Sequence, residues 1–194
     1  MLETLVYSIL AYFVGSISFG ILLSNLFKIP DPRTFGSKNP GATNVMRSGK
    51  KLAALCTLLG DTIKGFLVTY LAIKFNLSEA AIFVTSITVF LGHLYPIYYK
   101  FKGGKGVATA LGILLAINIY LGLTVLLVWL FVFLIFRISS LSALVAAISA
   151  PAIYFYFFDN IYMQYLTIFL MVMLLFRHQE NIKNLLSGSE SSFK

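Results

Sequence analysis

The side chains that could carry chemistry in this chain lie in three short segments between long apolar runs. The first segment is the loop 36–47, with the sequence Gly36-Ser37-Lys38-Asn39-Pro40-Gly41-Ala42-Thr43-Asn44-Val45-Met46-Arg47. Its glycines and its Asn-Pro pair favour turns, and Ser37, Thr43 and Asn44 offer hydrogen bonds and helix caps. Such a loop can direct several backbone N–H groups at one anion, most effectively where a helix follows. The alternative is an ordinary turn that caps the next helix.

The second segment is the glycine-lysine segment 100–106, with the sequence Lys100-Phe101-Lys102-Gly103-Gly104-Lys105-Gly106. Lysines at the end of an apolar run often act only as anchors, but anchoring does not need the backbone freedom of three glycines. We therefore expect Gly103 and Gly104 to let the chain approach a ligand while Lys105 supplies a point charge. The segment is not a nucleotide P-loop, because Gly106 follows Lys105 where Ser or Thr is required.

The third segment follows the last apolar run and reads Arg177-His178-Gln179-Glu180-Asn181-Ile182. If it is helical, His178 and Asn181 are three residues apart and face the same way. An imidazole beside a carboxamide is typical of a polar pocket, and histidine can exchange a proton near neutral pH. Arg177 alone is also compatible with an anchor at a membrane interface.

A few further polar residues lie inside or at the start of the apolar runs. Asp61 and Lys64 are three residues apart, and a buried charge is costly enough that we expect them to pair. His93 is either a hydrogen-bonded structural residue, which we favour, or a base. Ser140 and Ser142 either cap the run that they begin or reach toward a polar pocket.

This inventory excludes several kinds of chemistry. Metal sites need clustered carboxylates or several His and Cys ligands, whereas the acidic residues here are scattered, so we expect no metal and no other cofactor. No protein nucleophile stands out. Hydroxyls, carboxamides, backbone amides, Lys and Arg bind phosphate and stabilise negative charge on an acyl carbonyl or a departing phosphate. The simplest fitting chemistry is direct transfer between two phosphate-bearing molecules, one of them a lipid.

Membrane helices must position these segments. The 194 residues are 59% hydrophobic and only 11% charged, too few charges to cover a soluble domain. The net charge of +8 indicates an anionic partner, and its placement in short loops favours phosphate or lipid over nucleic acid. The apolar runs cover Thr4–Phe27, Leu52–Ile73, Ala80–Tyr99, Val107–Phe136, Leu141–Phe158 and Ile161–Phe176. We expect residues 1–194 to form a single all-α domain.

The fourth run decides the topology. Its 30 uncharged residues are too long for one comfortable span and short for two. If it divides near Asn118 into a short helix, Val107–Ile117, and a full one, the chain has seven segments. Thirteen basic residues then share the side opposite the N-terminus: Lys28, Arg33, Lys38, Arg47, Lys50, Lys51, Lys100, Lys102, Lys105, Arg137, Arg177, Lys183 and Lys194.

Only Lys74 lies on the other side in that arrangement, whereas a six-segment arrangement gives nine basic residues against five. The positive-inside rule therefore favours a polytopic membrane protein with seven transmembrane helices, one of them short. It places the N-terminus outside and the C-terminus in the cytoplasm.

Four blocks of residues carry a resemblance to a known family. They are Gly15-Ser16-Ile17-Ser18-Phe19-Gly20, the loop Gly36 to Asn44 with Arg47, the stretch Gly92 to Thr109, and Arg177-His178 with Glu180-Asn181-Ile182. In this order and spacing they resemble the bacterial acyl-phosphate:glycerol-3-phosphate acyltransferases. Ser18 and Gln179 depart from the family's pattern, in which we would expect proline and a basic residue.

The resemblance implies transfer of an acyl chain from acyl phosphate to the 1-hydroxyl of sn-glycerol 3-phosphate, giving lysophosphatidic acid and phosphate. It implies a bacterial inner-membrane location, with the site facing the cytoplasm and membrane lipid as a partner. Carried onto this chain, the polar residues closest to the chemistry are Ser37, Arg47, Lys105, His178 and Asn181. The expected substrate-binding residues are Lys38, Asn39, Gly41, Thr43, Asn44, Gly103, Gly104 and Ser142.

Two alternatives stay open at this point. Either His178 or a phosphate oxygen of the substrate serves as the base. A transporter of phosphate or of a phosphorylated solute is the rival to the enzyme, because a short broken helix with a glycine-lysine segment suits such a protein too. The sequence predicts neither the preferred acyl-chain length nor the oligomeric state.

Overall fold

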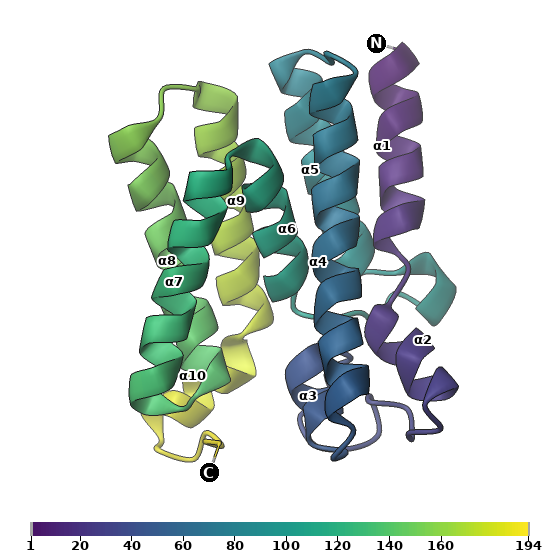
Figure 1. Ribbon diagram of the computed structural model, residues 1–194, viewed down its shortest axis with the longest axis vertical. Coiled ribbons are helices and arrows are strands. Elements are labelled where there is room, and N and C mark those ends of the chain that lie inside the picture. The colour runs from purple at the N-terminus through teal and green to yellow at the C-terminus, as the bar shows by residue number, and fades with distance from the viewer. Residues whose placement is uncertain (1, 194) are drawn as a thin grey trace.

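The structure is a computed structural model that describes residues 2–193. Within these residues the regular structure is entirely helical (Figure 1). The helices are α1 (Leu2–Gly15), α2 (Phe19–Leu26), α3 (Ala42–Met46), α4 (Lys51–Lys74), α5 (Glu79–Leu94), η1 (Ile97–Tyr99), α6 (Val107–Ile117), α7 (Ile119–Phe136), α8 (Ser139–Phe157), α9 (Ile161–Arg177) and α10 (Gln179–Leu186).

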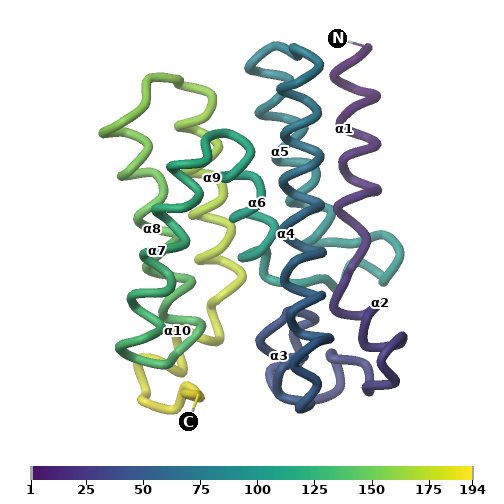
Figure 2. Tube along the Cα trace, viewed as in Figure 1, coloured from purple at the N-terminus to yellow at the C-terminus, as the bar shows by residue number. Residues whose placement is uncertain are grey.

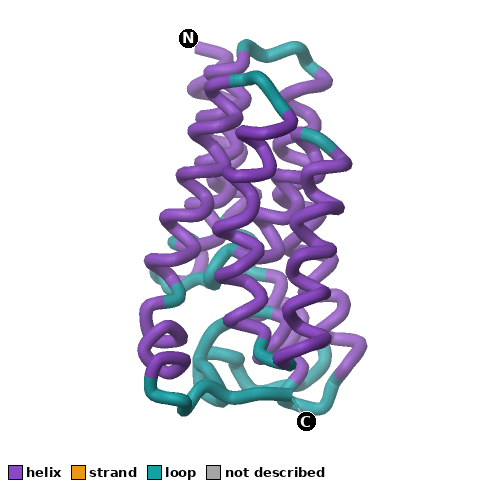
Figure 3. The backbone as a smooth tube through the Cα atoms, turned by 90° about the vertical axis from the view of Figure 1, so that its left-hand side faces the viewer, coloured by secondary structure: helices purple, strands orange, loops and turns teal. Residues whose placement is uncertain are grey.

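The long helices run side by side, and the two ends of the chain lie at opposite ends of the bundle (Figure 2). The loop backbone is concentrated at the end that carries the C-terminus (Figure 3). The short helices α2, α3 and α10 lie at this end as well (Figure 1). We call it the polar end. The opposite end holds only short connections between helices. The polar end therefore has the longer loops from which a polar site can be built.

The predicted membrane class is confirmed. Five helical stretches are long and apolar enough to cross a bilayer: Leu2–Leu26, Lys51–Lys74, Glu79–Tyr99, Ile119–Phe136 and Ser139–Phe157. A sixth arises if α9 and α10, which are bent by 63°, count as one span. Leu127, Phe131 and Leu134 of α7 are 63%, 67% and 74% exposed, as expected of a surface that faces lipid.

The predicted division of the fourth apolar run is confirmed at the predicted residue. Helix α6 ends at Ile117, and the Asn118 side chain accepts hydrogen bonds from the backbone N–H groups of Tyr120 (2.9 Å) and Leu121 (3.2 Å), which caps α7. Because α6 has only 11 residues, its end must be shielded by protein. The number of seven spans remains a prediction.

Glycines allow α6 to lie directly against α4. A Cβ on Gly65 would stand 2.4 Å from the carbonyl oxygen of Thr109, and one on Gly112 would stand 2.0 Å from that of Thr62. Small residues permit this close backbone approach between membrane helices. The contact fixes the start of α6, and therefore the end of the glycine-lysine segment that precedes it.

The first apolar run, expected as one helix over Thr4–Phe27, is broken. Helix α1 ends at Gly15 and α2 begins at Phe19, although together they form one candidate span. The break leaves the carbonyl oxygen of Ile17 outside helical hydrogen bonding, and Lys64 of α4 donates to it at 2.7 Å. A polar partner from another helix thus satisfies the opened backbone.

Candidate active site

The loop 36–47 is held in shape by one buried side chain. Asn44 is fully buried, and its Nδ2 donates to the carbonyl oxygens of Pro32 (2.7 Å) and Phe35 (3.1 Å). Its Oδ1 accepts from the backbone N–H of Ser37 at 3.0 Å. Gly36 has a φ of +54°, and a Cβ there would lie 2.2 Å from Asn44 Oδ1. The structure therefore uses Asn44, an expected ligand residue, to brace the loop.

The rest of the loop leads into α3 and on toward α8. Gly41 precedes α3 with a φ of −106°, so the backbone freedom expected there is not needed. The hydroxyl of Thr43 lies 3.1 Å from that of Ser139 at the start of α8. Ser37, Lys38 and Asn39 remain at least partly exposed at the polar end. These exposed groups are the ones available to a ligand.

The glycines of the second segment approach another part of the chain. A Cβ on Gly103 would stand 2.1 Å from the carbonyl oxygen of His93, and one on Gly104 would stand 2.3 Å from His93 Nε2. The Gly104 N–H donates to the same carbonyl at 3.2 Å. Among these three glycines, only Gly106 has a left-handed backbone, with a φ of +95°. The close approach, which the sequence predicts toward a ligand, is made in the structure to His93 of α5.

Arg177 brings the third segment to the second. Its Nη2 donates to the carbonyl oxygens of Gly104 (3.1 Å) and Gly103 (3.3 Å), and its guanidinium lies 5.5 Å from the centroid of the Tyr95 ring. From the sequence, this residue was part of the third segment but had no expected role beyond a possible anchor. The bonds show that the end of α9 and the glycine-lysine segment lie on the same side of the bundle, as one shared pocket requires.

His178 stands at the bend between α9 and α10 and is 4% exposed. Burial lowers its pKa to about 4 despite a backbone hydrogen bond, and nearby Lys105 also lowers the pKa. The ring is therefore neutral at pH 7. Its Nδ1 lies 2.8 Å from the carbonyl oxygen of Leu174, so Nδ1 carries the proton and donates. The neutral ring keeps Nε2 as a hydrogen-bond acceptor.

Lys105 and Asn181 are in direct contact. The Lys105 ammonium donates to Asn181 Oδ1, and the Asn181 Nδ2 donates to Glu190 Oε1 at 2.6 Å. The Ser140 hydroxyl donates to the same carboxylate oxygen at 2.6 Å. The pKa of Lys105 is lowered, mainly by burial. Among its charged neighbours, Glu190 raises the pKa most, and Arg177 and then Arg47 lower it. These groups therefore share one electrostatic environment.

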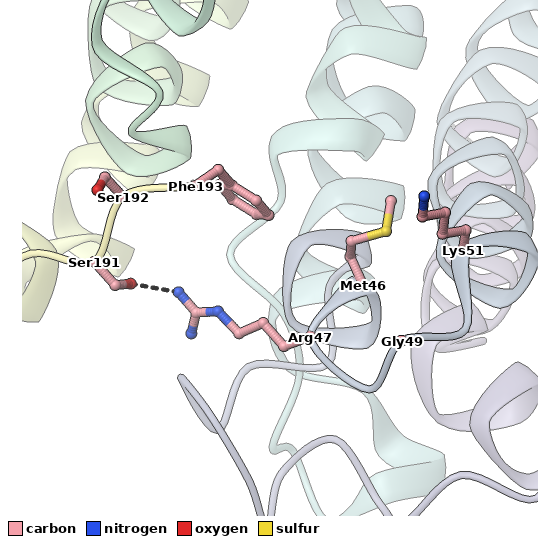
Figure 4. A pocket seen from close by; sticks show the side chains of 7 residues that line it. All are labelled: Met46, Arg47, Gly49, Lys51, Ser191, Ser192 and Phe193. Carbon is pink, nitrogen blue, oxygen red and sulfur yellow. Dashed lines mark hydrogen bonds between the residues drawn. The ribbon is translucent and has the colours of Figure 1, made fainter.

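The C-terminal tail crosses this site and reaches Arg47. Arg47 Nη2 donates to the Ser191 hydroxyl at 2.5 Å (Figure 4). A cavity of about 340 Å³ lies between the tail and the start of α4. It is lined by Met46, Arg47, Gly49, Lys51, Ser191, Ser192 and Phe193 (Figure 4). Tail and loop together thus form one wall of the polar end.

A second cavity, of about 330 Å³, opens between the loop 36–47 and the glycine-lysine segment. Its lining is strongly basic: Arg33, Lys38, Phe101, Lys102, Gly103 and Arg177. Arg33 is paired with Asp31 at 2.6 Å. The hydrogen bond to Arg33 lowers the pKa of this carboxyl group. The other cations on this wall give it a positive charge suited to an anion.

One expected site residue makes its side-chain hydrogen bond to the start of its own helix. Ser142 is fully buried, and its hydroxyl donates to the carbonyl oxygen of Ile138 at 2.9 Å, within α8. Ser140, two residues earlier, is the serine that reaches the cluster. Glu190 was missed altogether, because a short polar tail carries no periodic pattern that predicts where it docks.

Comparisons with known proteins agree with this arrangement. The chain matches the family model described as Glycerol-3-phosphate acyltransferase over residues 5–188. It is 54% identical to the "Glycerol-3-phosphate acyltransferase" of Methylobacillus flagellatus over 97% of this chain and 96% of that protein. It is 50% identical to the protein of that name from Herminiimonas arsenicoxydans, over 98% of this chain and 95% of the relative.

Two solved structures share the whole fold. Both are of PlsY, described as an integral membrane glycerol 3-phosphate acyltransferase. The glycerol 3-phosphate form matches with a TM-score of 0.94 and 38% identity, over 99% of this chain and 96% of that chain. The lysophosphatidic acid form gives 0.93 and 37%. With its site assembled at one end of an all-helical membrane bundle, this chain belongs to the glycerol-3-phosphate acyltransferase family.

Proposed function

We propose that this protein moves a fatty acyl chain from acyl phosphate to the 1-hydroxyl of sn-glycerol 3-phosphate. The products are lysophosphatidic acid and inorganic phosphate, and the reaction is the first acylation of phospholipid synthesis. Family membership supports the acceptor and the reaction type. The titles of the two matched structures name glycerol 3-phosphate and lysophosphatidic acid forms, an acceptor and a product of this kind.

The observation that carries the proposal is the position of Glu190. Its carboxylate oxygen accepts from Asn181 and Ser140, beside the ammonium of Lys105. A carboxylate is chemically close to one edge of a phosphate, since both present anionic oxygens to the same donors. Donors from two different helices therefore converge on one anionic group beside a lysine ammonium, which is what a phosphate-bearing substrate needs.

The cations have a clear role in this reaction. Arg47 and Lys105 neutralise the substrate phosphates, and the exposed residues of the loop 36–47 donate hydrogen bonds to one of them. Positive charge next to the departing phosphate lowers the barrier, because negative charge grows there as the acyl–oxygen bond breaks. Holding two phosphate-bearing reactants together can supply on the order of 7 kcal/mol by orientation alone.

The proton of the acceptor hydroxyl must also leave. The oxygen of this hydroxyl forms the new bond to the acyl carbon, the bond from that carbon to the phosphate oxygen breaks, and inorganic phosphate departs. Neutral His178 can accept the proton or hydrogen bond through Nε2, since Nδ1 is occupied by Leu174. A phosphate oxygen of the substrate is the second possible acceptor.

The proposal includes the membrane arrangement. We assign α6 and the bent α9 as spans beside the five long ones, which makes seven, with the N-terminus outside. The site then faces the cytoplasm of a bacterial inner membrane. Lysines and arginines gathered at the polar end support this orientation, because basic residues are retained on the cytoplasmic side. The acyl chain of the donor would enter laterally from lipid.

The test is release of inorganic phosphate from palmitoyl phosphate by protein purified in detergent, with and without glycerol 3-phosphate. We expect release that depends on the acceptor, with stoichiometric formation of 1-acylglycerol 3-phosphate, and no transfer from palmitoyl-CoA. Transfer from the thioester alone would contradict the donor. Uptake of phosphate into vesicles without any turnover in detergent would instead support a transporter.

A further inference from the structure

A buried charged network lies within the helices directly beneath the glycine-lysine segment. It consists of Asp61 and Lys64 on α4 and His93 on α5, which are 2%, 4% and 5% exposed. Lys64 Nζ lies 2.8 Å from Asp61 Oδ1, which confirms the pairing expected from the sequence. Desolvating such a pair is expensive, and well-packed apolar residues are often at least as stabilising. Its presence calls for a role other than stability.

Three groups from different parts of the chain surround the ammonium of Lys64. These are Asp61 Oδ1, the carbonyl oxygen of Ile17 at 2.7 Å, and His93 Nδ1 at 2.9 Å. Since an ammonium only donates, Nδ1 is the acceptor in the last bond, and the neutral ring carries its proton on Nε2. Lys64 therefore fixes both the orientation and the tautomer of His93.

The far edge of the His93 ring supports Gly104. The ring atoms Nε2 and Cε1 lie 2.3 and 2.8 Å from the place where a Cβ on Gly104 would stand. His93 also accepts the Gly104 N–H through its backbone carbonyl, and Arg177 holds the Gly104 carbonyl from the other side. The residue that follows Gly104 is Lys105, which contacts Asn181. The position and orientation of the Lys105 backbone thus depend on the His93 ring, which lies against Gly104.

We propose that His93, held by the Asp61–Lys64 pair, is a positioning residue that sets the glycine-lysine segment for catalysis. This inference rests on the proposed function, because Lys105 is assigned there to the substrate phosphates. The sequence left His93 as either a structural residue or a base. In this proposal the ring acts through Gly104 and does not exchange protons with substrate. The network connects the α1–α2 break, α4 and α5 to a single backbone position in the site.

A neighbouring pair shows what a purely structural link between α4 and α5 looks like. The hydroxyls of Thr69 and Ser86 are buried and lie 3.1 Å apart, between the same two helices. Neither residue contacts the glycine-lysine segment through a hydrogen bond within residues 2–193. Thr69→Val therefore removes a buried polar link of the same helix pair without touching the proposed support, and it serves as the matched control.

The test is a double-mutant cycle between His93→Asn and Gly104→Ala, measured as kcat/KM for glycerol 3-phosphate. Asn keeps an acceptor for Lys64 near the position of Nδ1 but removes the ring edge beneath Gly104. We expect His93→Asn to lower kcat/KM at least tenfold. We expect Gly104→Ala to do the same, because the new Cβ collides with the ring. In the double variant the Cβ occupies the space that the ring leaves, and activity recovers at least threefold over either single variant.

Melting temperatures of all variants in detergent separate this role from a loss of folding. We expect His93→Asn to melt near the wild type, and Thr69→Val to retain wild-type kcat/KM. Full activity of His93→Asn would overturn the proposal, and so would losses that simply multiply in the double variant. A wild-type protein that does not transfer from acyl phosphate counts against the proposed function instead, and the cycle is then run with the donor that it does use.

Discussion

Two groups of charged side chains lie a short distance apart in this molecule, and they differ in how their charges are matched. Inside the bundle, Lys64 has a carboxylate, a carbonyl and an imidazole around it, all from the chain itself. At the polar end, Arg47, Lys105 and Arg177 bond to neutral oxygens of serine, asparagine and glycine. The first group is complete without a ligand, whereas the second has positive charge left for an anionic substrate.

The largest expected effect is on stability, and it comes from the internal group. Lys64→Met leaves Asp61 as an uncompensated buried charge, which costs about 3–5 kcal/mol. Thermal melting in detergent measures this loss. Adding Asp61→Asn removes the orphaned charge and should restore most of the melting temperature. A double variant no more stable than Lys64→Met would show that the two groups are not matched to each other.

The next effect is on catalysis, at the polar end. Lys105→Ala should lower kcat/KM by about 100-fold, as expected when a charged donor to a developing anion is removed, with little change in melting temperature. Lys183→Ala is the matched control, because Lys183 lies on α10 two residues after Asn181 but is 72% exposed. Equal effects of the two substitutions would contradict a specific role for Lys105.

The dependence of stability on pH should report on His178. Its pKa is lowered to about 4, so between pH 6.5 and 4 the unfolded chain binds a proton that the folded chain does not. Stability supplied by the neutral ring is therefore present at pH 7 and is lost as the pH falls, by about 1 kcal/mol at pH 5.5. His178→Asn should melt with a shallower pH dependence in this range. An unchanged profile would mean that His178 binds its proton as readily in the folded as in the unfolded chain.

The smallest effect concerns Glu190, the carboxylate bonded to Asn181 at the polar end. Glu190→Gln removes an internal anion that occupies the donors of Asn181 and Ser140. We expect KM for glycerol 3-phosphate to fall by roughly threefold, the size of a partly exposed ion-pair contribution. Initial rates over a range of acceptor concentrations measure it. A KM that rises instead would make Glu190 part of the acceptor site and not its competitor.

Sequence reasoning predicted the framework well, because membrane spans follow simple rules of length and charge. The 11-residue α6 and its end at Ile117 followed from one overlong apolar run, whereas the capping of α7 by the Asn118 side chain is seen only in the structure. The convergence of three polar segments also followed from counting lysines and arginines on each side. The structure joins the second and third segments through the bonds of Arg177 to Gly104 and of Lys105 to Asn181. Lys38 of the loop 36–47 lines one cavity together with Gly103 and Arg177.

The remaining features depend on contacts that have no local pattern. Gly103 and Gly104 could be recognised as sites of close approach, but the approaching group is His93, which only packing identifies. The break between α1 and α2 is stabilised by Lys64, 47 residues away from Ile17. Glu190 lies in a tail whose contacts include two side chains, Asn181 and Ser140, that belong to different helices.

The central claim is that cations from separate segments form one anion site at the polar end. Isothermal titration of glycerol 3-phosphate into the detergent-solubilised protein tests it most directly. We expect saturable binding at one site per chain, lost in both Arg47→Ala and Lys105→Ala and unchanged in Lys183→Ala. Undiminished binding in either of the first two variants would show that these side chains do not share a site.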